Sequence, residues 1–323
     1  LILFLASCST QGNNSEVGLT HVNVCYSALA STQTVVWYAF EKGLFEKYGL
    51  DVNLVKITGG SSAATALISG DMDICQVGAT QVVNAVAAHQ DLVIIAGLIN
   101  IAPGFLVSQP EITSLEMIKG KIIGSDRGSL GESMIRLVLE RNGIDPDKDV
   151  KWLSIPSTGD LAALKAKQID LTHSSPPSTQ KLLDNGFFML LDIGSLKIPY
   201  QGTSIAVTRQ YLAKNREVVT SFMKAILETF VRIKMDQDGS ITVMSKYLDL
   251  DPVTDAEALK AAYTSILLNV LENVPYPTEE GLQVVINIAA KDNPDAGVIK
   301  PADLLDTSIL HQLEESGFIK KLK

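Results

Sequence analysis

Residues 21–57 read HVNVCYSALASTQTVVWYAFEKGLFEKYGLDVNLVKI and predict a strand, a helix and a second strand in succession. The apolar run His21–Ser27 has the length and composition of a buried strand. Apolar residues then recur at helical spacing along one side of Thr32–Lys47, and Leu50–Ile57 is a second strand-like run. A strand–helix–strand unit of this kind indicates parallel strands joined by a crossover helix.

The same alternation continues along the chain in two series. The first series extends to about residue 99, and the second begins after Gln109-Pro110 and extends to Ile193. Beyond Thr208 the pattern is almost entirely helical. Because 323 residues also exceed one ordinary domain, we predict an α/β fold of two lobes. Each lobe should hold a mainly parallel sheet flanked by helices.

A short internal repeat in the sequence supports two related lobes. The segment Ala64–Leu67 is followed six residues later by Asp73, and Ala162–Leu164 is followed six residues later by Asp170. Each aspartate opens an apolar strand that ends in a small polar loop. The equal spacing indicates that the two segments occupy equivalent places in the two lobes.

Composition and charge make several functions improbable. The chain has 27 Lys and Arg against 36 Asp and Glu, a net charge of −9. Such a chain repels phosphate backbones, so we expect no nucleic-acid partner. No apolar run after residue 10 reaches the eighteen or so residues that a membrane span needs.

The N-terminal segment suggests export and a lipid anchor. Leu5-Ala6-Ser7-Cys8 resembles a bacterial lipobox, in which the cysteine thiol receives diacylglycerol. The polar residues that follow are typical of a flexible tether, so we assign residues 1–18 to a signal remnant and tether with Cys8 as the lipidation site. The alternative is a buried strand that contains the cysteine. The lipobox predicts a cell-envelope lipoprotein, periplasmic or on the outer face of the membrane, that meets the membrane through its anchor only.

The other cysteines, Cys25 and Cys75, lie fifty residues apart in apolar runs. An exported protein can oxidise such a pair to a disulfide, but we favour buried free thiols. The four histidines are scattered and none has zinc-ligand spacing, so no metal site is expected. The chain also lacks a Gly-x-Ser-x-Gly elbow, a P-loop and a Gly-x-Gly-x-x-Gly motif after a strand, so we expect neither catalysis nor a cofactor.

The loops after the predicted strands are consistently small and polar. In open parallel sheets, ligands bind beyond the carboxyl ends of the strands. Backbone N–H groups, hydroxyls and helix N-termini there suit polar or anionic ligand atoms, although the same residues also cap helices. The candidate ligand-binding residues in these loops are Ser31, Thr32, Gln33, Gly60, Ser61, Thr80, Gln81, Arg127, Ser129, Thr158, Ser174 and Ser175.

A few aromatic residues lie close to these loops. Trp37 falls one helical turn after Gln33 on the same side, and Tyr200 precedes Gln201 where the chain returns to the first lobe. Aromatic rings in such places can sandwich a planar ligand. Trp37 is explained equally well as a core residue. We add Trp37, Tyr200 and Gln201 to the candidate ligand-binding residues.

Several motifs resemble one family of periplasmic binding proteins. Phe40–Val52 resembles the opening of the nitrate, sulfonate or taurine and thiamine-pyrimidine-type binding proteins, and Gly70–Ile74 is similar to the Gly-Asp-x-Asp-Ile of that family. Ser174–Pro177, Ile198–Gly202 and Val274–Thr278 also resemble family segments. These motifs are specific for the family but not for the ligand.

The resemblance implies a two-lobed solute-binding protein of an ABC importer, not an enzyme. Its ligand would be trapped as the lobes close about a hinge of two crossovers, near Phe105–Pro110 and Gly202–Thr208. Lobe 1 would then comprise residues 19–107 with 205–323, and lobe 2 residues 108–204. The expected partners are a small-molecule ligand and the permease subunits, with the protein itself a monomer.

The ligand class is less constrained. Family members bind nitrate, sulfonates, the thiamine pyrimidine or riboflavin, and anion binders of this family use few basic groups. Neutral loops and nearby aromatic rings favour a planar, vitamin-like ligand such as riboflavin or the thiamine pyrimidine; the alternative is a sulfonate, taurine or nitrate binder. The fungal thiamine-pyrimidine synthases share the fold but have a cysteine-rich iron site, which this chain lacks.

Overall fold

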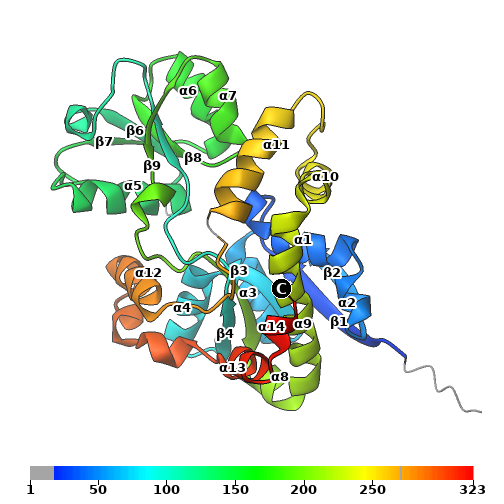
Figure 1. Cartoon of the computed structure of the whole chain (residues 1–323). Helices are drawn as coiled ribbons and strands as arrows, with labels where there is room; N and C mark the ends of the chain where they lie inside the picture. Colours follow the sequence, from blue (N-terminus) through cyan, green and yellow to red (C-terminus); the bar gives the residue numbers. More distant parts are fainter. Residues whose placement is uncertain (1–17, 128, 270, 323) are drawn as a thin grey trace, which may run out of the picture.

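Two five-stranded sheets, one in each of two lobes, organise the part of the chain that the computed structural model describes, residues 18–127, 129–269 and 271–322 (Figure 1). This arrangement confirms the predicted two-lobed α/β fold. The predicted anchor at Cys8 and its tether up to residue 17 lie outside the described residues. Among those residues, no helix is long and apolar enough to cross a membrane.

The first sheet has the order β2-β1-β3-β10-β4. Its strands β1, β2 and β3 are parallel to one another, and β10 runs antiparallel between β3 and β4. The sheet is therefore mainly parallel, as predicted, with one reversed strand. The strands are β1 (Thr20–Tyr26), β2 (Leu50–Lys56), β3 (Ile74–Gly78), β4 (Leu92–Gly97) and β10 (Thr203–Thr208).

The second sheet repeats this pattern with the order β7-β6-β8-β5-β9. Here β5 is the reversed strand, between β8 and β9. The equal topology of the two sheets agrees with the short internal repeat in the sequence. The strands are β5 (Phe105–Ser108), β6 (Ile122–Ser125), β7 (Lys151–Ser154), β8 (Leu171–Ser174) and β9 (Phe188–Asp192).

Helices cover both sheets and follow the strands as expected. Those of the first lobe before the crossover are α1 (Thr34–Glu41), α2 (Leu44–Lys47), α3 (Gly60–Ser69) and α4 (Ala79–Ala87), with a 3-10 turn η1 (Ser31–Gln33) before α1. Those of the second lobe are α5 (Leu130–Arg141), α6 (Asp160–Lys165) and α7 (Ser178–Asp184), with the 3-10 turns η2 (Leu115–Ile118), η3 (Ser157–Gly159) and η4 (Gly194–Leu196).

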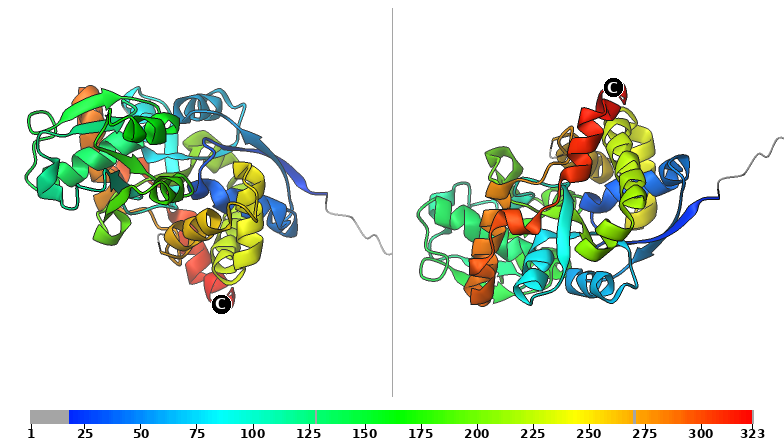
Figure 2. Two further views of the ribbon diagram at one scale, coloured as in Figure 1. Left: turned by 90° about the horizontal axis from the view of Figure 1, so that it is seen from above. Right: turned by 90° about the horizontal axis from the view of Figure 1, so that it is seen from below.

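The C-terminal third is helical, as predicted. Two of its helices approach the second lobe: α11 packs against α7, and α12 lies next to α5, as Figures 1 and 2 show. The helices are α8 (Arg209–Lys214), α9 (Arg216–Met235), α10 (Gln237–Leu248), α11 (Ala256–Ala262), a π-helical turn η5 (Tyr263–Leu268), α12 (Glu279–Asp292), α13 (Ser308–Glu315) and α14 (Phe318–Lys321), with the 3-10 turns η6 (Pro294–Val298) and η7 (Pro301–Leu304).

The opening strand–helix–strand unit is confirmed with one correction. The single helix predicted over Thr32–Lys47 is divided into α1 and α2, because Gly43 adopts φ +63° between them. Glycine enters this left-handed region without a Cβ clash and so ends the first helix.

The hinge consists of two crossovers that pair with each other. Residues 98–104 lead from β4 to β5, and residues 193–202 lead from β9 to β10. The Ala102 N–H donates to the Ile198 carbonyl at 2.9 Å, and the Tyr200 N–H donates to the Asn100 carbonyl at 3.1 Å. The crossovers were predicted near 105–110 and 202–208, but those segments are largely β5 and β10, and the crossovers lie just before them in the chain. The predicted lobe boundaries at 107/108 and 204/205 would divide these two strands, so we propose boundaries within the crossovers instead.

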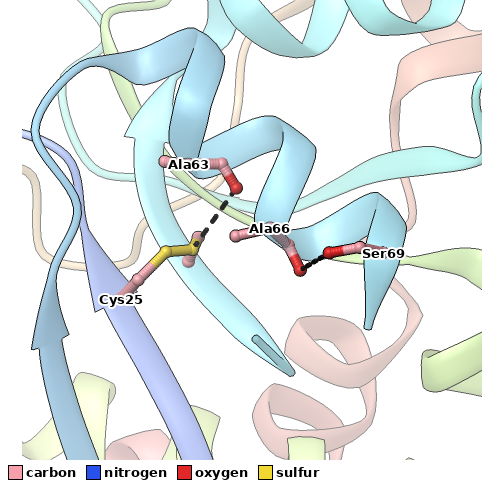
Figure 3. The surroundings of a disulfide bond; sticks show 5 residues. Cys25, Ala63, Ala66 and Ser69 are labelled. Atoms are coloured by element: carbon pink, nitrogen blue, oxygen red, sulfur yellow. Dashed lines mark hydrogen bonds between the residues drawn. A yellow bond between two sulfur atoms is a disulfide. The ribbon is translucent and has the colours of Figure 1, made fainter. Parts of the chain in front are cut away.

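Cys25 and Cys75 form a disulfide, so the predicted free thiols were wrong (Figure 3). The parallel pairing of β1 and β3 makes the two cysteines direct partners, with their Cα atoms 4.5 Å apart. This separation lies within the range that a disulfide spans. The bond is wholly buried beneath α3, where Cys75 Sγ lies 3.9 Å from the carbonyl oxygen of Ala63. Strand register, which creates the pair, could not be obtained from the spacing of the cysteines.

Candidate functional site

A cavity of about 330 Å³ lies between the lobes at the carboxyl ends of β6 and β8. Loops of the second lobe form most of its wall, and Leu29 and Ala30, from the loop after β1, line it from the first lobe. This position matches the general rule for ligand sites in open α/β sheets. The volume is at the low end of the range for small-molecule pockets.

Hydroxyl groups form much of the polar lining. Ser129 caps α5 by accepting the Glu132 N–H at 3.2 Å, and its Oγ lies 3.3 Å from Ser125 Oγ. On the other side, Thr179 Oγ1 donates to Ser174 Oγ at 3.2 Å. These bonds fix the loops after β6 and β8, so the hydroxyl-lined wall is preorganised.

Asp160 is a lining residue that the sequence-based selection omitted. The residue is only 6% exposed, and its Oδ1 has no hydrogen-bond partner among the described residues. Burial raises the pKa of Asp160 to about 7, an effect that a hydrogen bond with the Thr172 side chain partly offsets. Asp160 lies in the first turn of α6, where an aspartate ordinarily complements the helix dipole in solvent, so its residue type alone does not indicate a ligand-binding role.

His173 connects the cavity to the hinge. Its Nε2 lies 3.1 Å from the carbonyl oxygen of Pro103, in the first crossover. Burial lowers the pKa of His173, which favours the neutral ring at neutral pH. The ring packs directly on Gly104, where an added Cβ would overlap with Nε2.

Replacing Gly104 with alanine should therefore destabilise the protein by about 2 kcal/mol. The residue adopts φ +99°, which strains any side chain, and the new methyl group would also displace His173. Gly120→Ala is the matched control, because Gly120 has φ +80° but open space around its Cβ position. Urea denaturation of both variants separates the two effects. Equal destabilisation would show that His173 does not pack tightly on the hinge.

The two lobes also touch across the mouth of the cavity. Ser31 Oγ donates to the Pro176 carbonyl at 3.3 Å, and Ser31 is buried. The hydroxyl joins the loop after β1 to the loop after β8. A second link lies behind the hinge, where Lys291 of α12 pairs with Glu140 of α5 at 2.8 Å.

Some predicted ligand residues meet at the cavity and others do not. Ser129, Ser174 and Ser175 line it, and Ser31 lies at its edge. Arg127 instead lines an adjoining groove of about 470 Å³, which shares Ser125 with the cavity and which Arg136 and Lys291 also line. The predicted residues that do not line the cavity are Thr32, Gln33, Trp37, Gly60, Ser61, Thr80, Gln81, Arg127, Thr158, Tyr200 and Gln201.

The first-lobe candidates form a neighbouring group. Gln76 Nε2 donates to the Thr32 carbonyl at 2.8 Å, while Gln76 Oε1 and Gln33 Oε1 are buried without a partner in the described part of the chain. The Gln81 side chain occupies the space that a Cβ would need at Gly60 or Gly78. These contacts explain the small residues at the starts of α3 and α4 by packing. Ser61 and Thr158 are exposed.

The aromatic candidates are part of the interior. Trp37 is 0% exposed, stacks on Tyr247 with ring centres 4.7 Å apart, and meets the edge of Tyr26 at 5.4 Å. Neither it nor the buried Tyr200 offers a ring face to the cavity in this arrangement. Gln201 is likewise a hinge residue, since its Nε2 donates to the Ile99 carbonyl and to Ser204 Oγ.

The charges at the cavity are acidic. Asp126 and Asp160 line it together with His173, and no Lys or Arg is found among its described lining residues. Within the described ranges, no group of three or more His, Cys, Asp or Glu side chains could hold a metal ion. The wall can therefore accept hydrogen bonds from a neutral or cationic ligand, while it offers no ion pair to an anion.

Comparison with known proteins gives one family match and several relatives of similar sequence. A family model described as NMT1/THI5 like matches residues 31–237, more than half of the chain. YtlA, a candidate binding protein of Bacillus subtilis (strain 168), is 26% identical over 263 residues, 78% of this chain and 77% of YtlA. A candidate periplasmic binding protein of an ABC transporter from Brachyspira hyodysenteriae is 24% identical over 251 residues, 73% of this chain and 71% of its own length. The formylaminopyrimidine-binding protein of Halalkalibacterium halodurans is 22% identical over 280 residues, 84% of each chain.

Solved structures share the architecture. The periplasmic aliphatic sulphonate binding protein SsuA from Escherichia coli superposes with a TM-score of 0.71 at 18% identity, covering 90% of this chain and 96% of SsuA. The periplasmic nitrate-binding protein NrtA from Synechocystis PCC 6803 gives 0.71 at 12% identity, covering 92% of this chain and 89% of NrtA. This likeness confirms the periplasmic-binding-protein fold. With the family match, it follows that the chain belongs to the NMT1/THI5-like family, and the relatives compared above are named as binding proteins rather than as enzymes.

Proposed function

We propose that this protein captures a small, neutral or cationic nitrogen heterocycle of the thiamine-pyrimidine type and delivers it to an ABC importer. The observation that carries the proposal is the interlobe cavity, whose described lining combines hydroxyls with two carboxyl groups and no Lys or Arg. A ligand that donates hydrogen bonds suits such a wall. The relative that binds formylaminopyrimidine supports the same ligand class.

The transport role rests on the hinge and on the relatives. A ligand that contacts both lobes favours the closed form, and a permease can recognise that form. The Brachyspira relative is named as a periplasmic component of an ABC transporter. Export agrees with the buried Cys25–Cys75 disulfide, since such bonds persist in oxidising compartments. We further propose that the protein is a monomer held at the membrane by a lipid on Cys8.

The volume of the cavity suits a ligand with one ring better than a ligand with three fused rings. At about 330 Å³ it is small among ligand pockets, so a pyrimidine fits more readily than a flavin. A sulfonate or nitrate would have to approach the Asp126 carboxyl group, and Arg127 lines the adjoining groove and not the cavity itself. Charge repulsion from Asp126 at short range therefore opposes an anionic ligand.

A thermal-shift screen tests the ligand class. The panel contains 4-amino-5-hydroxymethyl-2-methylpyrimidine, thiamine, riboflavin, nucleobases, taurine, an alkyl sulfonate and nitrate. A ligand at a thousand times its Kd stabilises the fold by about 4 kcal/mol, which gives a clear shift. We expect the aminopyrimidine to shift the transition and the anions to leave it unchanged. A shift with taurine, sulfonate or nitrate alone would overturn the proposal.

Two matched variants test the location of the site. Ser175→Phe places a ring in the cavity wall, whereas Ser61→Phe places the same ring on the exposed surface of α3. We expect the first variant to abolish the ligand-induced shift and the second to retain it, with similar stability of both without ligand. The reverse result would move the site to the first-lobe loops.

A further inference from the structure

We propose that Asp160 is the residue that determines ligand specificity, and that it selects an amino group adjacent to a ring nitrogen. The inference rests on the proposed function and deepens it, because it names the chemical edge that the cavity recognises. An aminopyrimidine carries this edge: the amine donates a hydrogen bond, and the ring nitrogen beside it accepts one. A carboxylic acid is complementary, since its carbonyl oxygen accepts and its hydroxyl donates.

The contacts around Asp160 leave one of its side-chain oxygens without a hydrogen-bond donor. The residue is more than nine-tenths buried, lines the cavity, and has one side-chain oxygen without a partner among the described residues. Thr172 is the hydroxyl within its reach, but Thr172 Oγ1 also donates to the Gly124 carbonyl at 3.0 Å. Buried carboxyl oxygens are normally hydrogen-bonded, so the missing donor is an unexplained feature of this wall. A ligand amine supplies it.

The surrounding charges do not supply a counterion. The other titratable groups that line the cavity are Asp126, which is exposed, and His173, whose ring is bonded toward the hinge. Burial without a cation raises the pKa of Asp160 to about 7. Near neutral pH the carboxyl group is therefore protonated in a large fraction of molecules, which is the form that offers both a donor and an acceptor.

This pairing predicts proton-linked binding. The hydrogen bond between the Asp160 oxygen and the ring nitrogen requires one proton, which either atom can carry. Below about pH 7 the free protein already carries that proton. Above it the proton must come from solvent, so the apparent Kd for a neutral aminopyrimidine should rise toward about tenfold per pH unit.

Two substitutions distinguish the contribution of the hydrogen-bonding pattern of Asp160 from that of its titratable proton. Asp160→Asn keeps one donor and one acceptor, the pattern that asparagine uses on adenine, but cannot titrate. Asp160→Leu removes both at similar volume. By calorimetry with 4-amino-5-hydroxymethyl-2-methylpyrimidine, we expect the Asn variant to bind within a few-fold of the parent at pH 6.5 with no rise in Kd at higher pH. The Leu variant should bind about 10- to 100-fold more weakly.

Controls use an aspartate outside the cavity and a matched ligand. Asp238→Asn and Asp238→Leu alter an exposed first-turn aspartate of α10 that does not line the cavity, and both should retain the affinity and the pH dependence. The pyrimidine with a methyl group in place of the 4-amine lacks the donor, and the parent should bind it about 10- to 100-fold more weakly. Equal binding of the two ligands, or a pH dependence that survives in Asp160→Asn, would overturn the inference.

A readout without ligand completes the test. The folded-state pKa of Asp160 is raised above its unfolded value of about 3.9, so its protonated form favours folding. The stability that it contributes is present below about pH 4 and is lost as the pH rises toward about 7. Asp160→Asn should remove this component from the pH profile of unfolding.

The binding results also distinguish failure of the inference from failure of the proposed function. If another heterocycle binds and Asp160→Leu has no effect on its affinity, the inference fails while the proposed function stands. If only anions bind, the proposed function itself fails.

Discussion

Replacing Trp37 with alanine is expected to destabilise the fold by about 3–5 kcal/mol. The indole is 0% exposed, stacks on Tyr247 of α10 at 4.7 Å, and contacts the edge of Tyr26 of β1 at 5.4 Å. Its removal leaves a large cavity and ends two aromatic contacts that join the sheet to the C-terminal helices. The free energy of unfolding, measured by urea denaturation without ligand, tests this.

Trp37→Phe is the matched variant. A phenyl ring preserves part of the stack and removes an indole N–H that has no partner among the described residues. We therefore expect a much smaller loss of stability than with alanine. The alternative from the sequence, a ring that stacks on the ligand, makes the opposite prediction: Trp37→Ala would leave stability nearly unchanged and weaken binding at least tenfold. That result would return Trp37 to the ligand site.

Much of the architecture was accessible from sequence because it follows from short-range patterns. The strand and helix periods in residues 21–57 predict the opening unit, and the repeat around Asp73 and Asp170 predicts two related lobes. The equal strand order of the two sheets agrees with that prediction. The hinge was misplaced by several residues, because Phe105–Ser108 and Thr203–Thr208 are apolar strands whose sheet membership depends on partners distant in sequence. Local composition does not determine which sheet a strand joins.

The site was predicted less well, since burial and side-chain direction depend on packing. Ser129, Ser174 and Ser175 were found because they follow strands, and they line the cavity. Arg127 follows the same strand as Ser129 yet lines another groove. Asp160 was passed over because a first-turn aspartate usually serves the helix dipole in solvent. Its burial depends on packing against segments distant in sequence, among them β6 and Thr172 of β8, which no local pattern reveals.

Removing the Cys25–Cys75 disulfide should lower the free energy of unfolding by about 4 kcal/mol. The bond closes a loop between residues 50 positions apart, and the loss of that constraint gives the unfolded chain more freedom. The double variant Cys25→Ala/Cys75→Ala, compared with the parent by urea denaturation, measures the effect. Both positions are wholly buried, so alanine adds no polar group to the core.

The single variants decide between a disulfide and two free thiols. If the bond exists, either Cys25→Ala or Cys75→Ala alone removes it, so each single variant should lose nearly as much stability as the double variant. Two independent thiols would instead give small, additive losses of about 1 kcal/mol each. The strand register makes the first outcome the expected one, because it places the two residues directly opposite each other on β1 and β3. Additivity would contradict the bond and remove its support for export. The cavity lining and the Asp160 inference would not be affected.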